Sequence, residues 1–174
     1  MRKPERIEAK CPSYNKRGGI FIKIQWKKLI LCLIIPLAVG GLSAFLTRNS
    51  MTSFETLTKP PLSPPGWLFP VVWTILYLLM GFASYLVLTS GKPSTLGILA
   101  YGAQLFFNFL WSIFFFNQEK YLFSFIWLVV LWFLILATTI LFYRNTKTAG
   151  YLLIPYLLWV TFAGYLNFGI YLLN

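Results

Sequence analysis

The chain has 174 residues, of which 58% are hydrophobic and only 11% are charged, and its net charge is +11. A soluble globular domain carries roughly a quarter of charged residues, so this composition excludes that class and indicates a membrane protein. The sequence has no histidine and only four acidic residues, which excludes a Ser–His–Asp triad and the common metal sites, and we expect neither a metal nor a cofactor.

Residues 1–28 form a basic segment that holds nine of the fifteen Lys and Arg residues. Hydrophobic residues such as Phe21 and Trp26 are interleaved with these cations, a pattern typical of a segment that lies on an anionic membrane surface. A disordered, solvated tail is the alternative. The segment is longer than the basic region of a cleaved signal peptide, so we expect it to remain as a cytoplasmic tail.

Residues 29–174 contain five stretches without a charged residue, each longer than the roughly 18 apolar residues that indicate a membrane-spanning helix. These stretches are residues 29–47, 60–91, 93–118, 121–143 and 148–174. The sequence therefore predicts an all-α membrane protein: a single bundle of five transmembrane helices, with no separate soluble domain.

The positive charges are unequally divided between the two ends of this predicted bundle. One end, which includes the basic tail, carries twelve Lys and Arg residues, and the other carries only Arg48, Lys59 and Lys120. Because Lys and Arg concentrate on the cytoplasmic side, we expect a multi-pass protein of the cell membrane with its N-terminus in the cytoplasm and its C-terminus outside. This placement favours the lipid bilayer, and not nucleic acid, as the partner of the positive charge.

The first connection, residues 48–65, is much longer than the others and has four prolines within residues 60–65. Proline fixes φ and lacks a backbone donor, so this segment must be a stiff extended or turning connection. A connection this long in a compact bundle usually has a function. We expect a structured outer lid that includes Pro64, Pro65 and Trp67.

Three predicted helices each place an aromatic residue and a small or polar residue on one face. The residues that share a face are Trp73, Tyr77, Met80 and Ser84 in the second helix, Gln104, Asn108 and Trp111 in the third, and Trp159, Ala163 and Asn167 in the fifth. Such faces together form an apolar pocket with a few hydrogen-bonding groups. Taken singly, each residue is better explained by packing between helices.

Small residues mark places where two helix backbones can approach closely in lipid. The first helix has Gly40 and Ala44 four residues apart, and the third has Gly97, Ala100 and Ala103. Each set is compatible with an internal seam of the bundle or with a dimer face, and the internal seam is favoured.

Three segments of the sequence carry motifs in a specific order, namely KP, PPxW, VW, LYxxMG and NFLWS. The segments are KPPLSPPGWLFPVVWTILYLLMGFASYLV, QLFFNFLWSIFFF and LLIPYLLWVTFAGYLNFGIYLLN. With these motifs, residues 29–174 resemble the tryptophan-rich sensory proteins, also called translocator proteins or peripheral-type benzodiazepine receptors (the TspO/MBR family).

This resemblance implies a five-helix bundle that binds porphyrins, sterols and isoquinoline carboxamide drugs in a cavity closed by the first connection, and it implies a homodimer. Transferred by motif, the implied ligand-binding residues are Phe54, Trp73, Asn108, Trp159 and Ala163. The helix faces described above add Tyr77 and Trp111. The short sterol-binding pattern cited for the end of the fifth helix is incomplete here, because no Lys or Arg follows Tyr171. We therefore do not expect a sterol as the ligand.

Three functions are compatible with these features. The first is a membrane receptor or sensor for tetrapyrroles such as porphyrin and for similar flat hydrophobic ligands. The second is a porphyrin-degrading enzyme, against which the lack of a conventional acid–base or metal site argues, as does Leu62 at a position where the family often has tryptophan. The third is a transporter of the same ligands, but the sequence has neither an inverted repeat nor an intramembrane acid. We rank the receptor first.

Overall fold

The computed structural model describes residues 24–50 and 56–174, and all regular secondary structure in these residues is helical. The long helices are α1 (Trp26–Thr47), α3 (Leu68–Leu88), α4 (Thr95–Ser112), α5 (Tyr121–Asn145) and α6 (Lys147–Leu173). A short 3₁₀ turn, η1 (Arg48–Ser50), follows α1, and a π-helical turn, η2 (Ile113–Asn117), extends α4. Five helical spans are long and apolar enough to cross a membrane, which confirms the predicted architecture.

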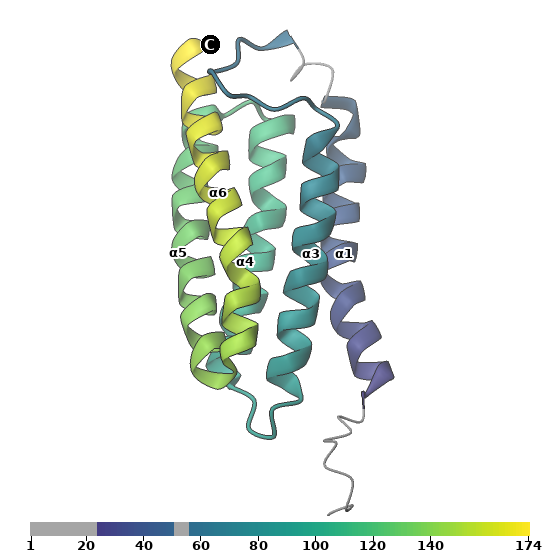
Figure 1. The fold of residues 1–174 in the computed structure, drawn as a ribbon. Coiled ribbons are helices and arrows are strands. Elements are labelled where there is room, and N and C mark those ends of the chain that lie inside the picture. Colours follow the sequence, from purple (N-terminus) through teal and green to yellow (C-terminus); the bar gives the residue numbers. More distant parts are fainter. Residues whose placement is uncertain (1–23, 51–55) are drawn as a thin grey trace, which may run out of the picture.

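The helices lie side by side in one bundle (Figure 1). In this view α5 and α6 are on one side, α1 is on the other, and α3 and α4 lie between them. Helix α5 packs mainly on α6 and α4, whereas α1 packs mainly on α3. Residues 56–67, which precede α3, lie across the end of the bundle where α6 ends, which we call the loop end (Figure 1).

The helix bounds differ from the charge-free stretches by a few residues. Helix α1 begins at Trp26, three residues before the predicted stretch, so Lys27 and Lys28 are exposed in its first turn. Helices α5 and α6 are joined through Thr146 alone. Residues 57–67 form no helix, as expected from their prolines.

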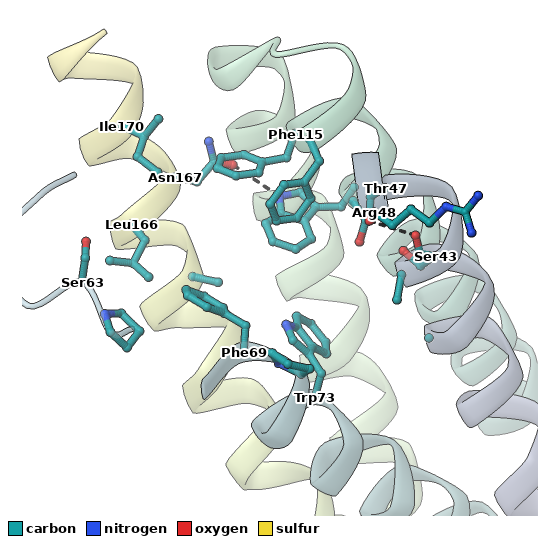
Figure 2. Close-up of a pocket in the computed structure, with 18 of the residues that line it drawn as sticks. Ser43, Thr47, Arg48, Ser63, Phe69, Trp73, Phe115, Leu166, Asn167 and Ile170 are labelled. Atoms are coloured by element: carbon teal, nitrogen blue, oxygen red, sulfur yellow. Dashed lines mark hydrogen bonds between the residues drawn. The ribbon is translucent and has the colours of Figure 1, made fainter. Parts of the chain in front are cut away.

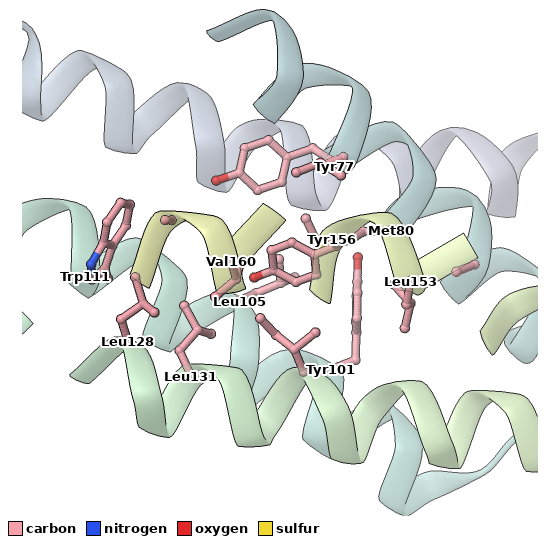
Figure 3. Close-up of a cluster of buried hydrophobic side chains, with 14 of the residues drawn as sticks. Tyr77, Met80, Tyr101, Leu105, Trp111, Leu128, Leu131, Leu153, Tyr156 and Val160 are labelled. Atoms are coloured by element: carbon pink, nitrogen blue, oxygen red, sulfur yellow. The ribbon is translucent and has the colours of Figure 1, made fainter. Parts of the chain in front are cut away.

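The centre of the bundle is built where α3, α4, α5 and α6 meet (Figure 3). Its fully buried residues include Met80, Leu131, Leu153 and Tyr156. Large apolar side chains on the outer surface of the bundle remain exposed; Leu158, for example, is 65% exposed. This distribution suits a bundle whose outer surface faces lipid, because apolar side chains there need no burial in protein.

Two glycines allow α1 and α3 to approach closely. A Cβ atom at Gly40 would overlap the ring of Tyr77, and a Cβ atom at Gly81 would lie 2.7 Å from the Cys32 carbonyl oxygen and 2.9 Å from Leu33 Cα. Helices in lipid are held together by van der Waals contact, so close backbone approach is a main source of their association. The Gly40 position therefore lies in an internal seam, the favoured reading of its sequence pattern.

The α1–α3 seam predicts an asymmetry between two glycines. We expect Gly81→Ala to lower the thermal unfolding midpoint in detergent, because its methyl group meets backbone atoms that cannot turn away and overpacking typically costs about 1–3 kcal/mol. Gly102→Ala is the matched control, since a Cβ at Gly102 would have nothing within 4 Å and alanine favours helix by roughly 0.5–1 kcal/mol. Equal midpoints for the two variants would contradict the seam.

Candidate ligand-binding site

A cavity of about 340 Å³ lies at the loop end of the bundle. Side chains from α1, α3, the α4–η2 segment and α6 line it, together with Lys59, Ser63 and Pro64 of the first connection. The volume falls within the roughly 300–1,000 Å³ of ordinary small-molecule pockets. Figure 2 shows Trp73 and Phe69 of α3 and Leu166 of α6 around this space.

Four of the seven ligand-binding residues predicted from the sequence line this cavity: Trp73, Tyr77, Trp111 and Ala163. The rings of Trp73 and Tyr77 are stacked with centroids 5.6 Å apart, and Trp73 lies 6.2 Å from Trp111. Trp111 stacks in turn on Phe115 at 5.6 Å. The structure thus joins α3 and the α4–η2 segment through one continuous set of aromatic rings.

Asn108 lies below the cavity and not in its lining. Its side chain is 1% exposed, and both ends of its amide are used within the protein. The Tyr77 hydroxyl donates to Asn108 Oδ1 at 2.8 Å, and Asn108 Nδ2 donates to the Tyr156 hydroxyl at 3.0 Å. In this arrangement Asn108 orients the Tyr77 ring that forms part of the cavity floor.

Trp159 lies behind the lining as well. Its ring packs edge-on against Phe69, with centroids 6.0 Å apart, and Phe69 itself faces the cavity. The Trp159 indole N–H is buried and has no hydrogen-bond partner among the described residues. Phe54, the remaining predicted residue, lies outside the described residues.

Several lining residues were not predicted, although part of their pattern is visible in the sequence. Gly40, Ala44 and Thr47 follow one another at helical spacing on α1, and Leu166 and Ile170 do so on α6. From the sequence, Gly40 and Ala44 are interpreted only as a packing surface, and Thr47 is not singled out. The small residues on α1 contribute both to helix packing and to the cavity, because they leave room for the Tyr77 ring on one side and for the cavity on the other.

The π-helical turn η2 contributes Phe115 and Phe116 to the cavity. Its wider hydrogen bonding is seen in the Gln118 backbone N–H, which donates to the Ile113 carbonyl at 3.2 Å. An inserted residue of this kind shifts the side chains that follow it, and π-turns are frequent at functional sites. Phe115, four residues after Trp111, nevertheless continues the helical spacing of the predicted face.

Asn167 fixes the orientation of Trp111 at the cavity wall. Its Oδ1 accepts hydrogen bonds from Trp111 Nε1 at 3.3 Å and from Ser124 Oγ at 3.0 Å. Its Nδ2 donates to the Tyr121 carbonyl at 2.9 Å. One buried amide therefore joins α4, α5 and α6 directly beside the aromatic lining.

The first connection is held against α6 by side chains at the loop end. Asn174 Nδ2 donates to the Thr58 carbonyl, and the Thr58 N–H donates to Asn174 Oδ1, both at 3.0 Å. The Tyr165 hydroxyl donates to the Pro61 carbonyl at 2.8 Å. A Cβ at Gly169 would lie 2.7 Å from the Pro60 ring, so the absence of a side chain there lets the connection rest on the helix.

The three predicted lid residues occupy different positions. Pro64 lines the cavity, whereas Pro65 and Trp67 do not, and Trp67 is 67% exposed. Leu62, at the turn that precedes them, has a positive φ of 68° and is 83% exposed. The backbone of this segment is thus shaped by the contacts of its prolines, not by burial of its apolar side chains.

The sequence of this chain is similar to those of known proteins over nearly all of the described helices. The sequence model of the TspO/MBR family matches residues 32–173. The chain belongs to the TspO/MBR family. Its membrane-spanning helices and the elements that line the cavity all lie within the matched residues, apart from the beginning of α1.

Members of the TspO/MBR family from distant organisms are similar to this chain over most of its length. The tryptophan-rich protein TspO of Chlorobaculum tepidum is 43% identical over 150 residues, which cover 84% of this chain and 95% of that protein. The protein of the same name from Archaeoglobus fulgidus is 38% identical, with 84% and 97% covered. The translocator protein of Bos taurus is 30% identical, with 82% and 88% covered.

The anchors of the first connection lead to a prediction about backbone exchange. We expect Asn174→Ala to speed hydrogen–deuterium exchange in residues 56–66 severalfold in a detergent or nanodisc sample, because the Thr58 N–H loses its acceptor. Asn145→Ala is the matched control, since Asn145 Nδ2 binds the Lys92 carbonyl in a connection at the opposite end. Unchanged exchange in Asn174→Ala would show that these two hydrogen bonds do not hold the connection.

Proposed function

We propose that this protein is a membrane receptor or sensor that binds tetrapyrroles, such as porphyrin, and similar flat hydrophobic molecules in the cavity at the loop end. The observation that carries this proposal is the lining: Phe69, Trp73, Trp111, Phe115 and Phe116 border one cavity between the helices. Large aromatic surfaces at ring spacings of about 5–6 Å suit stacking with a flat aromatic ligand.

Each predicted ligand-binding residue in the described part of the chain has a role in this proposal that follows from its position. Trp73, Trp111 and Ala163 contact the ligand directly, because they line the cavity. Asn108 and Trp159 act through Tyr77 and Phe69, the lining residues on which they lie. The isoquinoline carboxamide drugs implied by the family resemblance are further candidate ligands for the same space.

The first connection serves as the lid of this cavity in our proposal. Two observations support the role: Pro64 and Lys59 line the cavity from its open end, and Thr58 and Pro61 are anchored on α6. A segment stiffened by proline loses little conformational entropy when it closes over a ligand. Rigid closure therefore favours tight binding.

For the membrane orientation we propose a cell-membrane protein with the loop end outside. Among the described residues, the end of the bundle opposite the loop end carries five cations: Lys27, Lys28, Lys92, Arg144 and Lys147. The loop end carries three: Arg48, Lys59 and Lys120. The tendency of Lys and Arg to remain in the cytoplasm supports this orientation. A ligand would then enter from the outer leaflet or from outside the cell. We also keep the homodimer as a proposal.

The aromatic lining predicts the effect of removing one ring. We expect Trp73→Ala to weaken protoporphyrin binding by about 1–3 kcal/mol, the range for loss of one aromatic stacking partner, as measured by quenching of tryptophan fluorescence. Trp132→Ala is the matched control, because Trp132 binds the Thr161 hydroxyl outside the cavity. Equal affinities in both variants would place the pocket elsewhere.

The same titration separates binding from degradation. A porphyrin whose absorbance persists in light and oxygen is bound and unchanged, as expected of a receptor. Loss of absorbance that requires light and oxygen and disappears in Trp73→Phe would instead support the porphyrin-degrading enzyme.

The position of Ala163 predicts a dependence on ligand size. Ala163 lines the cavity and is 7% exposed, so a leucine there must occupy space inside it. We expect Ala163→Leu to weaken protoporphyrin binding by about 1–3 kcal/mol, the usual cost of overpacking, and to affect a smaller isoquinoline carboxamide less. Equal losses for the two ligands would contradict the placement of Ala163.

A further inference from the structure

We infer that the end of the bundle opposite the loop end binds the headgroup of an anionic phospholipid through Lys92, Arg144 and Lys147. Lys92 lies in the connection from α3 to α4, and the other two residues flank the junction of α5 and α6. Figure 1 shows both connections at this end of the bundle. The site is therefore separate from the cavity, and it does not depend on which ligand the cavity binds.

One hydrogen bond brings the three cations together. Asn145 lies between Arg144 and Lys147 in the sequence, and its Nδ2 donates to the Lys92 carbonyl at 2.7 Å. Its Oδ1 accepts from the Thr146 hydroxyl at 3.4 Å, so both ends of the amide are used. The two connections are thus fixed to each other, and all three cations start from backbone positions around their point of contact.

Close packing behind this point of contact holds the helix ends in place. A Cβ atom at Gly97 of α4 would lie 3.3 Å from Phe142 Cδ1 of α5, and the Phe142 ring lies 5.7 Å from that of Tyr101. A Cβ atom at Gly150 of α6 would lie 2.7 Å from Tyr143 Cα of α5. The cations are therefore carried on a rigid base, which lowers the entropy cost of binding between them.

The three cations have no acidic partner in the described part of the chain. Their side chains are exposed, and the acidic side chain within residues 24–50 and 56–174 is that of Glu119, at the loop end. Lys27 and Lys28 add the same sign of charge at the cation-rich end. Clustered cations without a counter-charge create a positive potential that attracts an anion, and arginine can bind two oxygen atoms of a phosphate at once.

The surroundings of the cations favour a lipid over a soluble anion. Leu96 in the first turn of α4 and Tyr151 in the second turn of α6 are both exposed. Tyr143, next to Arg144, is also exposed and packs edge-on against Tyr151, with ring centroids 5.5 Å apart. Tyrosines beside Lys and Arg are typical of the membrane–water interface. A headgroup at that level leaves its acyl chains on the apolar helix surface, and basic pockets at cytoplasmic helix ends bind anionic headgroups in this way.

Two lipids with the same acyl chains test this inference: phosphatidylglycerol, which has a net negative charge, and phosphatidylcholine, which has none. We expect the full-length protein in detergent to bind phosphatidylglycerol about tenfold more tightly, as measured by native mass spectrometry of the lipid-bound fraction. Arg144→Gln, Lys147→Gln and Lys92→Gln should each reduce this preference about threefold to fivefold, because each cation near a membrane surface contributes separately to the attraction.

Two further variants separate a built site from the overall charge of the protein. Asn145→Ala removes no charge, but it should also reduce the preference, because the two connections lose the hydrogen bond that joins them. Lys120→Gln is the matched control, since it removes one exposed cation at the loop end and should retain the preference.

Three results would overturn the inference. The first is equal affinity of the wild type for the two lipids. The second is an equal loss of preference in Lys120→Gln and Arg144→Gln, because net charge and not this cluster would then select the lipid. The third is displacement of phosphatidylglycerol by an excess of inorganic phosphate, which would identify a soluble anion as the ligand. Porphyrin binding in the cavity is measured separately, so the proposed function can stand or fail without this site.

Discussion

The buried hydrogen-bond chain from Tyr77 through Asn108 and Tyr156 to Gln104 is the interaction on which the rest of the bundle depends. The Tyr156 hydroxyl links its two halves, since it accepts from Asn108 and donates to Gln104 Oε1 at 2.9 Å. Lipid provides no hydrophobic force between helices, and an unpaired polar group in the interior is costly. These hydrogen bonds therefore fix the rotation of α3, α4 and α6 relative to one another. They also direct Trp73, one turn from Tyr77, toward the cavity.

Helix α1 is outside this hydrogen-bonded set, which gives the cavity two kinds of wall. Asn167 adds a second polar junction among α4, α5 and α6, so the aromatic wall is held at two depths. Side chains bind α1 near its ends, where Tyr85 accepts from the Gln25 N–H and Asn117 donates to the Leu46 carbonyl. Between them, the close contacts at Gly40 of α1 and Gly81 of α3 hold α1 in place. A cavity that must adapt to its ligand can therefore do so most easily at α1.

The sequence was sufficient for the fold and for one face each of α3, α4 and α6, but not for the lining of α1 or for depth within the bundle. Long apolar runs bounded by charges leave little choice but helices, and spacing brings Asn108 and Trp111 to the same side of α4. Spacing cannot tell that Trp111 reaches the cavity while Asn108 lies in the hydrogen-bonded layer below it. Phe115 was not predicted, although it lies four residues after Trp111 and so continues the helical spacing of Gln104, Asn108 and Trp111.

Two features position the proline-rich connection: a strained backbone conformation at Leu62 and the close packing of Pro60 on Gly169. In the turn closed by the Ser63 N–H on the Pro60 carbonyl, Leu62 adopts a left-handed conformation at a cost of roughly 1–3 kcal/mol. In return Pro60 lies on Gly169, where a larger residue would not fit. The remaining anchors are exposed hydrogen bonds, each worth only about 1 kcal/mol. A stiff segment with weak anchors can move as a unit, so in the proposed role it can open for a ligand without unfolding.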